Sequence, residues 1–329
     1  MPTPRAHRLA VRLAVLALAL AALGCDGAES PLAPDGAEPL PAETASPAPD
    51  FLTAGTGPRI LFASARTGGT DIYRMDPSGN NLVRVTSFAG SEDMPAWSWD
   101  NKRIAIVRDR LDGSNVLHKD IFLMNADGTG KRWARTLPSA YSITNPSWSH
   151  DGTRLVVSVW IGGVYSVPYL AQMNVATGEM NFIGQFGAIQ GLYASFDPTG
   201  KKLVYVGANG LSIETINLDG TGHQGILASP TGTVSGPVFS PDGKRIAYGR
   251  NYSGNYDVYV TTLLDGTVKR LTTNIAYDFA PTWSADGTRI AFVSFRSGKS
   301  QIWTMTSSGG SQTRITHTTV AESSPAWSH

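Results

Sequence analysis

Residues 280–294 read "APTWSADGTRIAFVS", and residues 324–329, "SPAWSH", repeat the opening of that stretch. The longer segment combines an apolar strand around Trp283, an Asp-Gly turn and a second apolar strand, "RIAFVS". Asp and Gly tolerate the positive φ angles that tight hairpins require. Apolar residues fill both alternating sets of positions in "RIAFVS", which is typical of a strand covered on both faces. The segment is therefore predicted to be a hairpin inside a larger β-structure.

The same pattern recurs along the chain, with 43 to 51 residues between successive aromatic positions. These aromatic positions are Trp97, Trp148, Phe196, Phe239, Trp283 and Trp327. A period of roughly 40–45 residues is the size of one four-stranded propeller blade. In the copy at Trp283, "QIWTM" and "TRIT" supply a third and a fourth strand on either side of the turn "SSGG". We therefore predict blades of four short strands.

The two ends of the repeat region carry complementary parts of one blade. The segment that starts at Arg59, "RILFASARTGGTDIYRMDPSGNNLVRVT", contains three strands and lacks the first one. Residues 324–329 supply that missing strand. The carboxyl-terminal strand is thus expected to join the amino-terminal blade and close the ring, which removes exposed sheet edges. The sequence predicts an all-β, six-bladed β-propeller of four-stranded blades over residues 56–329.

The first 25 residues have the pattern of an export signal. Three arginines precede an apolar run, residues 13–23, that is too short to span a bilayer. The run ends in "AALGC", which resembles a bacterial lipoprotein signal in which the cysteine, here Cys25, becomes lipidated. An ordinary secretory signal with an incidental cysteine is the alternative. Cys25 is the only cysteine, so it has no disulfide partner within the chain.

Residues 26–55 are rich in Pro and Ala and carry six acids without Lys or Arg. Such a segment cannot bury a core and is predicted to be a disordered tether. The remaining 56–329 carry 24 basic and 20 acidic side chains, which gives no strong field toward nucleic acid or anionic membrane. We expect an exported, monomeric lipoprotein facing the periplasm or the cell surface. It would contact the membrane through its lipid anchor only and bind no nucleic acid.

Motifs that carry catalysis or bind cofactors are not found in the sequence. There is no nucleophile elbow, no HExxH and no phosphate-binding loop. The six histidines do not have metal-ligand spacing. We therefore expect no catalytic residue, no cofactor and no metal.

One charged pattern recurs relative to the aromatic positions. Five residues before the aromatic, the six copies carry Glu92, Ile143, Gly191, Val234, Asp278 and Glu322. In the three copies with an acid, the residues thirteen positions after the aromatic are Arg110, Arg296 and Arg66. Because the first two strands of a blade form a hairpin, each arginine can reach the acid of its own blade. The predicted ion pairs are Glu92–Arg110, Asp278–Arg296 and Glu322–Arg66.

The alternative hypothesis gives these acids a role in binding a cation or a basic peptide group. Their position begins the innermost strand, so they would rim one mouth of the central channel, acidic on one side and apolar on the other. The ligand-binding candidates on this hypothesis are Glu92, Asp93, Tyr141, Ile143, Asp278 and Glu322.

The pattern "PxWSxDGxRIAFxSxRxGxxxIWxM" at residues 281–305 resembles the repeats of the TolB-like family, which are periplasmic six-bladed propellers of Gram-negative bacteria. TolB itself carries an amino-terminal α/β domain where this chain has residues 26–55. The resemblance implies a cell-envelope scaffold that binds a protein segment or peptide at the channel mouth. The alternative is a propeller enzyme, a lyase or hydrolase acting there on a polysaccharide or small molecule. Carboxylates without arginine partners would favour the enzyme, and paired ones would favour binding.

Overall fold

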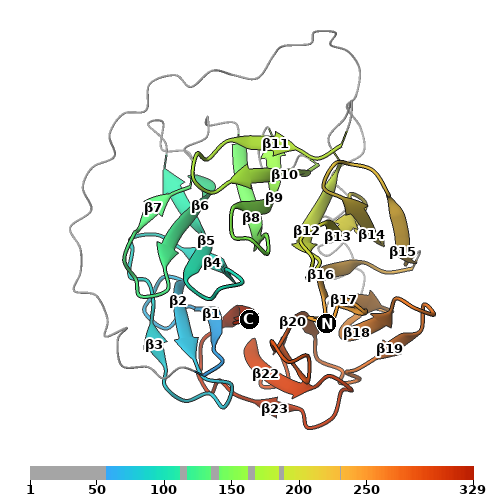
Figure 1. Ribbon diagram of the computed structural model, residues 1–329. Coiled ribbons are helices and arrows are strands. Elements are labelled where there is room, and N and C mark those ends of the chain that lie inside the picture. The colour runs from blue at the N-terminus through green and yellow to red at the C-terminus, as the bar shows by residue number, and fades with distance from the viewer. Residues whose placement is uncertain (1–56, 112–116, 135–140, 162–166, 185–188, 230) are drawn as a thin grey trace, which may run out of the picture.

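The computed structural model describes residues 57–111, 117–134, 141–161, 167–184, 189–229 and 231–329. Over these residues the chain forms 24 strands and no helix, and therefore no helix that could cross a membrane. The strands make six four-stranded antiparallel sheets arranged as blades around a central axis (Figure 1). The prediction of an all-β, six-bladed propeller is confirmed.

Each blade is given from its innermost strand outward. Blades 1 to 3 comprise β24 (Glu322–Trp327), β1 (Ile60–Ser64), β2 (Asp71–Met75) and β3 (Val83–Arg84); β4 (Glu92–Trp97), β5 (Arg103–Leu111), β6 (Leu117–Asn125) and β7 (Arg132–Trp133); and β8 (Tyr141–Trp148), β9 (Arg154–Ile161), β10 (Tyr169–Asn174) and β11 (Met180–Phe182).

The remaining three blades follow the same order. Blades 4 to 6 comprise β12 (Gly191–Phe196), β13 (Lys202–Gly207), β14 (Ser212–Asn217) and β15 (Gln224–Ala228); β16 (Val234–Phe239), β17 (Arg245–Tyr252), β18 (Asn255–Thr262) and β19 (Val268–Arg270); and β20 (Asp278–Trp283), β21 (Arg289–Ser294), β22 (Gln301–Thr306) and β23 (Thr313–Arg314).

The ring closes in blade 1 between strands from the two ends of the propeller. β24 pairs antiparallel with β1, with Ile60 opposite Trp327 and Ser64 opposite Glu322. Consecutive inner strands contact one another all the way around, including β24 with both β4 and β20. The expectation that the carboxyl-terminal strand completes the amino-terminal blade is therefore confirmed.

In blades 2 to 6, side chains of the turn after the inner strand hold that turn in place. In blade 6, the Ser284 hydroxyl donates to the Asp286 carboxylate at 2.6 Å and accepts from the Arg289 amide at 2.9 Å. Gly287 takes the left-handed conformation that this turn requires, with φ of +67°. In blade 2 the corresponding residue is Asn101 at φ of 56°, because Asn is among the few side chains that tolerate this region.

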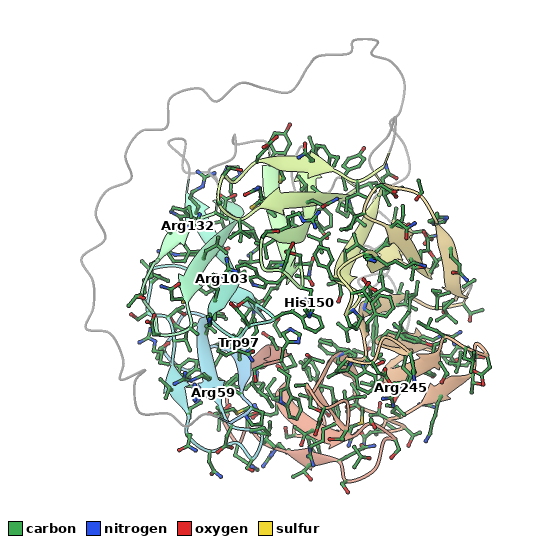
Figure 2. The ribbon with its side chains drawn as sticks, in the orientation of Figure 1. Arg59, Trp97, Arg103, Arg132, His150 and Arg245 are labelled. Carbon is green, nitrogen blue, oxygen red and sulfur yellow. The ribbon has the colours of Figure 1, made fainter. Side chains whose placement is uncertain are left out.

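The hydrophobic core lies between blades rather than inside any one of them (Figure 2). One cluster combines Ile121 of blade 2 with Trp148 and Leu155 of blade 3. The Trp148 indole also donates to the Ala96 carbonyl of the preceding blade at 3.1 Å, and the Arg103 guanidinium lies over its ring at 4.7 Å. The recurring aromatic thus joins each blade to its neighbour, which explains why the repeat keeps it.

Candidate functional site in the central channel

The residues five positions before the aromatic do not line the channel. Glu92, Ile143, Asp278 and Glu322 are 0% exposed, and Val234 is 3% exposed. Their side chains lie between blades, because each sheet packs against a neighbour on both faces. The expectation that this position rims the channel mouth is therefore wrong, and it is corrected to an interblade position.

Two of the predicted ion pairs are present within their blades. Arg296 Nη2 lies 2.6 Å from Asp278 Oδ2, and Arg66 Nη2 lies 2.7 Å from Glu322 Oε1. In both blades a serine stands directly opposite the acid on the second strand. The arginine two residues further along can therefore fold back over the serine to the carboxylate.

The third predicted pair, Glu92–Arg110, is wrong. In blade 2 the residue directly opposite Glu92 is Arg108, and its Nε lies 3.7 Å from Glu92 Oε1. Arg110 instead pairs with Asp120 of β6 at 2.5 Å. The cause is the longer hairpin of blade 2, in which β5 continues to Leu111 and carries Arg110 outward beside β6.

Glu92 differs from the other two acids in its electrostatics. Burial, with the negative charge of Asp71 as the next contribution, raises the pKa of Glu92 from 4.5 to about 8. Its second oxygen accepts from the Thr86 hydroxyl at 3.2 Å. Arg108 is itself enclosed by aromatic rings, with Phe88 at 4.0 Å from its guanidinium carbon. The raised pKa favours the protonated form of this carboxyl group, which lies close to Asp71 of blade 1.

The side chains that do line the channel come from a β-bulge in every inner strand. Three residues before the aromatic, the backbone of all six strands has a positive φ of 50–55°, and the pairing with the second strand shifts register there. We call these residues the bulge ring: Met94, Asn145, Tyr193, Gly236, Ala280 and Ser324. A bulge redirects the side chain that it carries, here from the blade interface into the channel.

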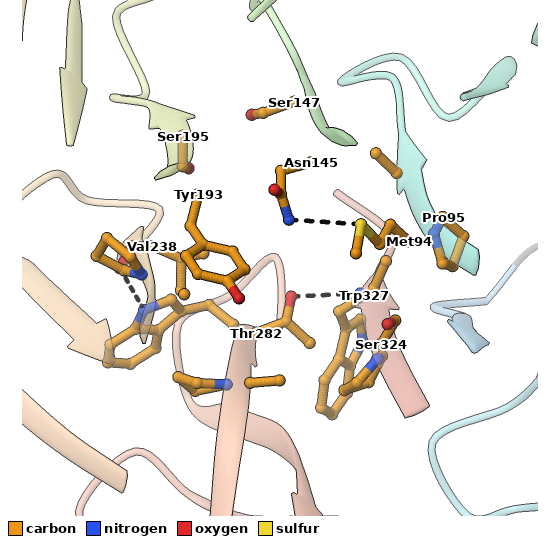
Figure 3. Close-up of a pocket in the computed structure, with 18 of the residues that line it drawn as sticks. Met94, Pro95, Asn145, Ser147, Tyr193, Ser195, Val238, Thr282, Ser324 and Trp327 are labelled. Carbon is orange, nitrogen blue, oxygen red and sulfur yellow. Dashed lines mark hydrogen bonds between the residues drawn. The ribbon is translucent and has the colours of Figure 1, made fainter. Parts of the chain in front are cut away.

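A cavity of about 670 Å³ follows the bulge ring along the channel (Figure 3). Serine, proline and aromatic side chains make up most of the wall, and no described lining residue is Asp, Glu, Lys or Arg. Binding pockets for organic ligands are typically 300–1,000 Å³, mostly apolar, with a few neutral or charged polar groups. The channel therefore has the size and chemistry of a binding site.

The cavity opens onto an aromatic cluster where the inner strands begin. This aromatic mouth consists of Tyr256, Tyr277, Phe279 and Phe295, with neighbouring rings 6.0–6.4 Å apart. Tyr277 is 43% exposed and Phe295 is 39% exposed. Exposed aromatic clusters beside a concavity mark interaction surfaces.

Tyr193 reaches into the middle of the channel from blade 4 (Figure 3). Burial inside the ring raises the pKa of its phenol, and Tyr256 and Asp93 add to that rise. The Asn145 amide lies beside it and donates to the Met94 sulfur at 3.4 Å. The polar groups on the ring are thus neutral hydrogen-bonding groups.

The two remaining candidates, Asp93 and Tyr141, are half-buried and do not belong to the lining of the cavity. Asp93 accepts a hydrogen bond from the Met94 amide at 2.7 Å, and Tyr141 packs against the core between blades 2 and 3. Their role in ligand binding stays a prediction. Cys25, the predicted signal and the predicted tether lie outside the described residues.

Comparison with known proteins places the repeats in a family. A family profile described as "TolB beta propeller domain" matches residues 195–329. A "Protein TolB homolog" of Chlorobium luteolum is 30% identical over 67% of this chain and 56% of its own length. The fold of TolB from Acinetobacter baumannii superposes with a TM-score of 0.68 at 20% identity, over 82% of this chain and 66% of that chain. The chain is a TolB-like propeller.

Another curated relative of this TolB-like propeller carries an enzymatic name. It is the "Uncharacterized peptidase YuxL" of Bacillus subtilis, 27% identical over 50% of this chain but only 24% of its own length. The chain thus spans little more than half of the TolB homologue and about a quarter of the peptidase. The described residues contain no group of three His, Cys, Asp or Glu side chains that could hold a metal ion.

The bulge ring was missed in the sequence although a signal for it exists. Five of the six inner strands carry proline directly after the bulge residue. Proline cannot donate to a sheet ladder, and within strands it marks edges and bulges. The acids that the sequence pattern singles out, Glu92, Asp278 and Glu322, are buried and do not line the cavity.

Proposed function

We propose that this TolB-like propeller is a scaffold of the cell envelope that binds a protein segment or peptide at the mouth of its central channel. The observation that carries the proposal is the cavity of about 670 Å³, whose described lining has no Asp, Glu, Lys or Arg and includes the exposed aromatic mouth. Aromatic side chains around a concavity are the usual energetic centres of protein interfaces. Likeness to the TolB-like family supports the envelope as the location.

Export and lipid anchoring at Cys25 are part of the same proposal. They rest on the sequence of residues 1–25, and the periplasm or cell surface is where an envelope scaffold would meet its partners. Two of the three predicted carboxylates, Asp278 and Glu322, are paired with arginine, which favours binding over the enzymatic alternative at those two positions. No described residue pair in the cavity forms a nucleophile and base.

The proposal is tested by photo-crosslinking in the native envelope. A photoreactive phenylalanine analogue replaces Tyr277 in the aromatic mouth. The matched control places the same analogue at Leu264, which is 95% exposed in the turn between β18 and β19, on the opposite face. We expect one discrete protein adduct from position 277 and none from 264. Adducts of equal identity and yield at both positions, or none at 277, would refute binding at this mouth.

A further inference from the structure

The side chains of the bulge ring are large on one side of the channel and small on the other. Blades 2, 3 and 4 contribute the large side chains Met94, Asn145 and Tyr193, whereas blades 5, 6 and 1 contribute Gly236, Ala280 and Ser324. All six residues share one backbone conformation, so the difference lies in side-chain volume alone. Large side chains therefore narrow the channel on one side, and small ring residues lie on the other. We call this small side, formed by Gly236, Ala280 and Ser324, the recess; two of its blades, 5 and 6, also carry the aromatic mouth.

The recess offers no described countercharge to a ligand. Its walls are the small ring residues, the Tyr193 ring and neighbouring prolines such as Pro237 and Pro281. Moving an ionised group from water into such a site costs much more than moving an apolar side chain, unless a partner charge compensates. The neutral hydroxyls of Tyr193 and Ser324 can still hydrogen-bond to the backbone of a bound segment.

One carboxylate near the channel, that of Asp93, would favour a cationic ligand over an uncharged one. Asp93 is half-buried beside the ring residue Met94, and its charge reaches Tyr193. It is not among the residues that line the cavity, and it lies in blade 2, whereas the recess is formed by blades 5, 6 and 1. A cationic ligand that paired with Asp93 would therefore bind on the side of the ring with the large side chains and not in the recess.

We propose that the recess formed by Gly236, Ala280 and Ser324 opposite Tyr193 is the seat for one uncharged, apolar side chain of the partner segment. The inference rests on the proposed function, which supplies the segment, and it adds the chemistry of the anchoring residue. An aromatic or branched aliphatic side chain enters past Tyr277 and Phe295, and it comes to rest against the small side of the ring.

The test uses three capped tripeptides, acetyl-Ala-Xaa-Ala-amide, with phenylalanine, lysine or glutamate at the centre. Binding to the whole folded protein is titrated by ligand-observed NMR at millimolar peptide. We expect the phenylalanine peptide to bind at least roughly tenfold more tightly than the other two, a difference that is readily resolved in dissociation constants. Tighter or equal binding of the lysine peptide that is lost in Asp93→Asn would overturn the proposal in favour of a cation site. Absence of any binding by the phenylalanine peptide would also overturn it.

Two variants test whether the recess is the binding site by placing a large side chain in it. Ala280→Tyr copies the residue that blade 4 carries at the same ring position, where Tyr193 has φ of 55° and Ala280 has 51°. Ser324→Met copies blade 2 in the same way. Each variant should raise the dissociation constant of the phenylalanine peptide at least roughly tenfold. Leu264→Tyr, on the opposite face, should leave that dissociation constant unchanged. If both fillings fold with native melting curves and bind as the wild type does, the seat is not in the recess.

Failure here and failure of the proposed function are distinguishable. The peptide titrations need no natural partner, and the crosslink from position 277 needs no particular anchoring side chain. A discrete adduct at 277 without a preference among the peptides would remove this inference and leave the scaffold function in place.

Discussion

At the level of single residues, the buried acids of this propeller lie in two different electrostatic environments. Asp278 and Glu322 each face an arginine at short distance, whereas Glu92 lies 3.7 Å from its arginine and close to a second acid. Breaking one partner of a buried ion pair is costly, because the other charge stays buried without compensation. The two environments therefore respond differently to mutation and to pH.

Removing the carboxylate of Asp278 should destabilise the protein strongly. Asp278 is fully buried and the Arg296 side chain is 13% exposed, so Asp278→Ala should lower the free energy of unfolding by about 3–5 kcal/mol. Adding Arg296→Ala should recover part of that loss, as measured by a double-mutant cycle in urea. The surface pair Asp151–Arg154, at 4.0 Å, is the control and should couple by less than about 1 kcal/mol. Equal coupling in both pairs would contradict the buried ion pair.

The raised pKa of Glu92 gives stability a defined pH dependence. Between pH 4.5 and about 8 the folded protein keeps the Glu92 proton and the unfolded chain has lost it. The unfolding free energy contributed by this group therefore falls as pH rises through that window, by at most about 1.4 kcal/mol per pH unit, and is constant above it. Glu92→Gln, which cannot ionise, should flatten the dependence in urea titrations from pH 5 to 9. Glu179→Gln, at an exposed position, should keep the pH dependence of the unfolding free energy. Identical slopes against pH in the two variants would exclude Glu92 as the cause of that dependence.

At the level of strands and turns, the fold was predictable because its signals are local and repeated. The aromatic at Trp283, the Asp-Gly turn and the doubly apolar second strand recur in register, and residues 324–329 match the strand that Arg59 lacks. The site was not predictable by counting along the same strand. Regular alternation fails at the bulge, where one extra residue turns a side chain into the channel. Neighbouring blades bury Glu92, Asp278 and Glu322. This burial depends on contacts between residues far apart in the sequence, so the pattern along one strand does not reveal it.

At the level of the whole molecule, closing the ring creates the channel, and the channel concentrates the differences among the blades. The repeat keeps its interblade aromatic and its turn nearly constant, while the bulge ring varies from Gly236 to Tyr193. Met94 and Ala280 also pack against interblade clusters, yet the same bulge carries residues as different as Gly236 and Tyr193. The aromatic mouth is carried by blades 5 and 6, which are adjacent in the ring (Figure 1).

The most direct measurement combines the mouth and the recess in one experiment. The photoreactive analogue at position 277 is placed in three backgrounds, namely wild type, Ala280→Tyr and Leu264→Tyr, and the adduct is quantified from native envelopes at equal protein levels. If the channel holds the partner, filling the recess should abolish the adduct, and the change on the opposite face should leave its yield unchanged. An adduct of undiminished yield in the Ala280→Tyr background would contradict the account, because the partner would then bind without entering the channel.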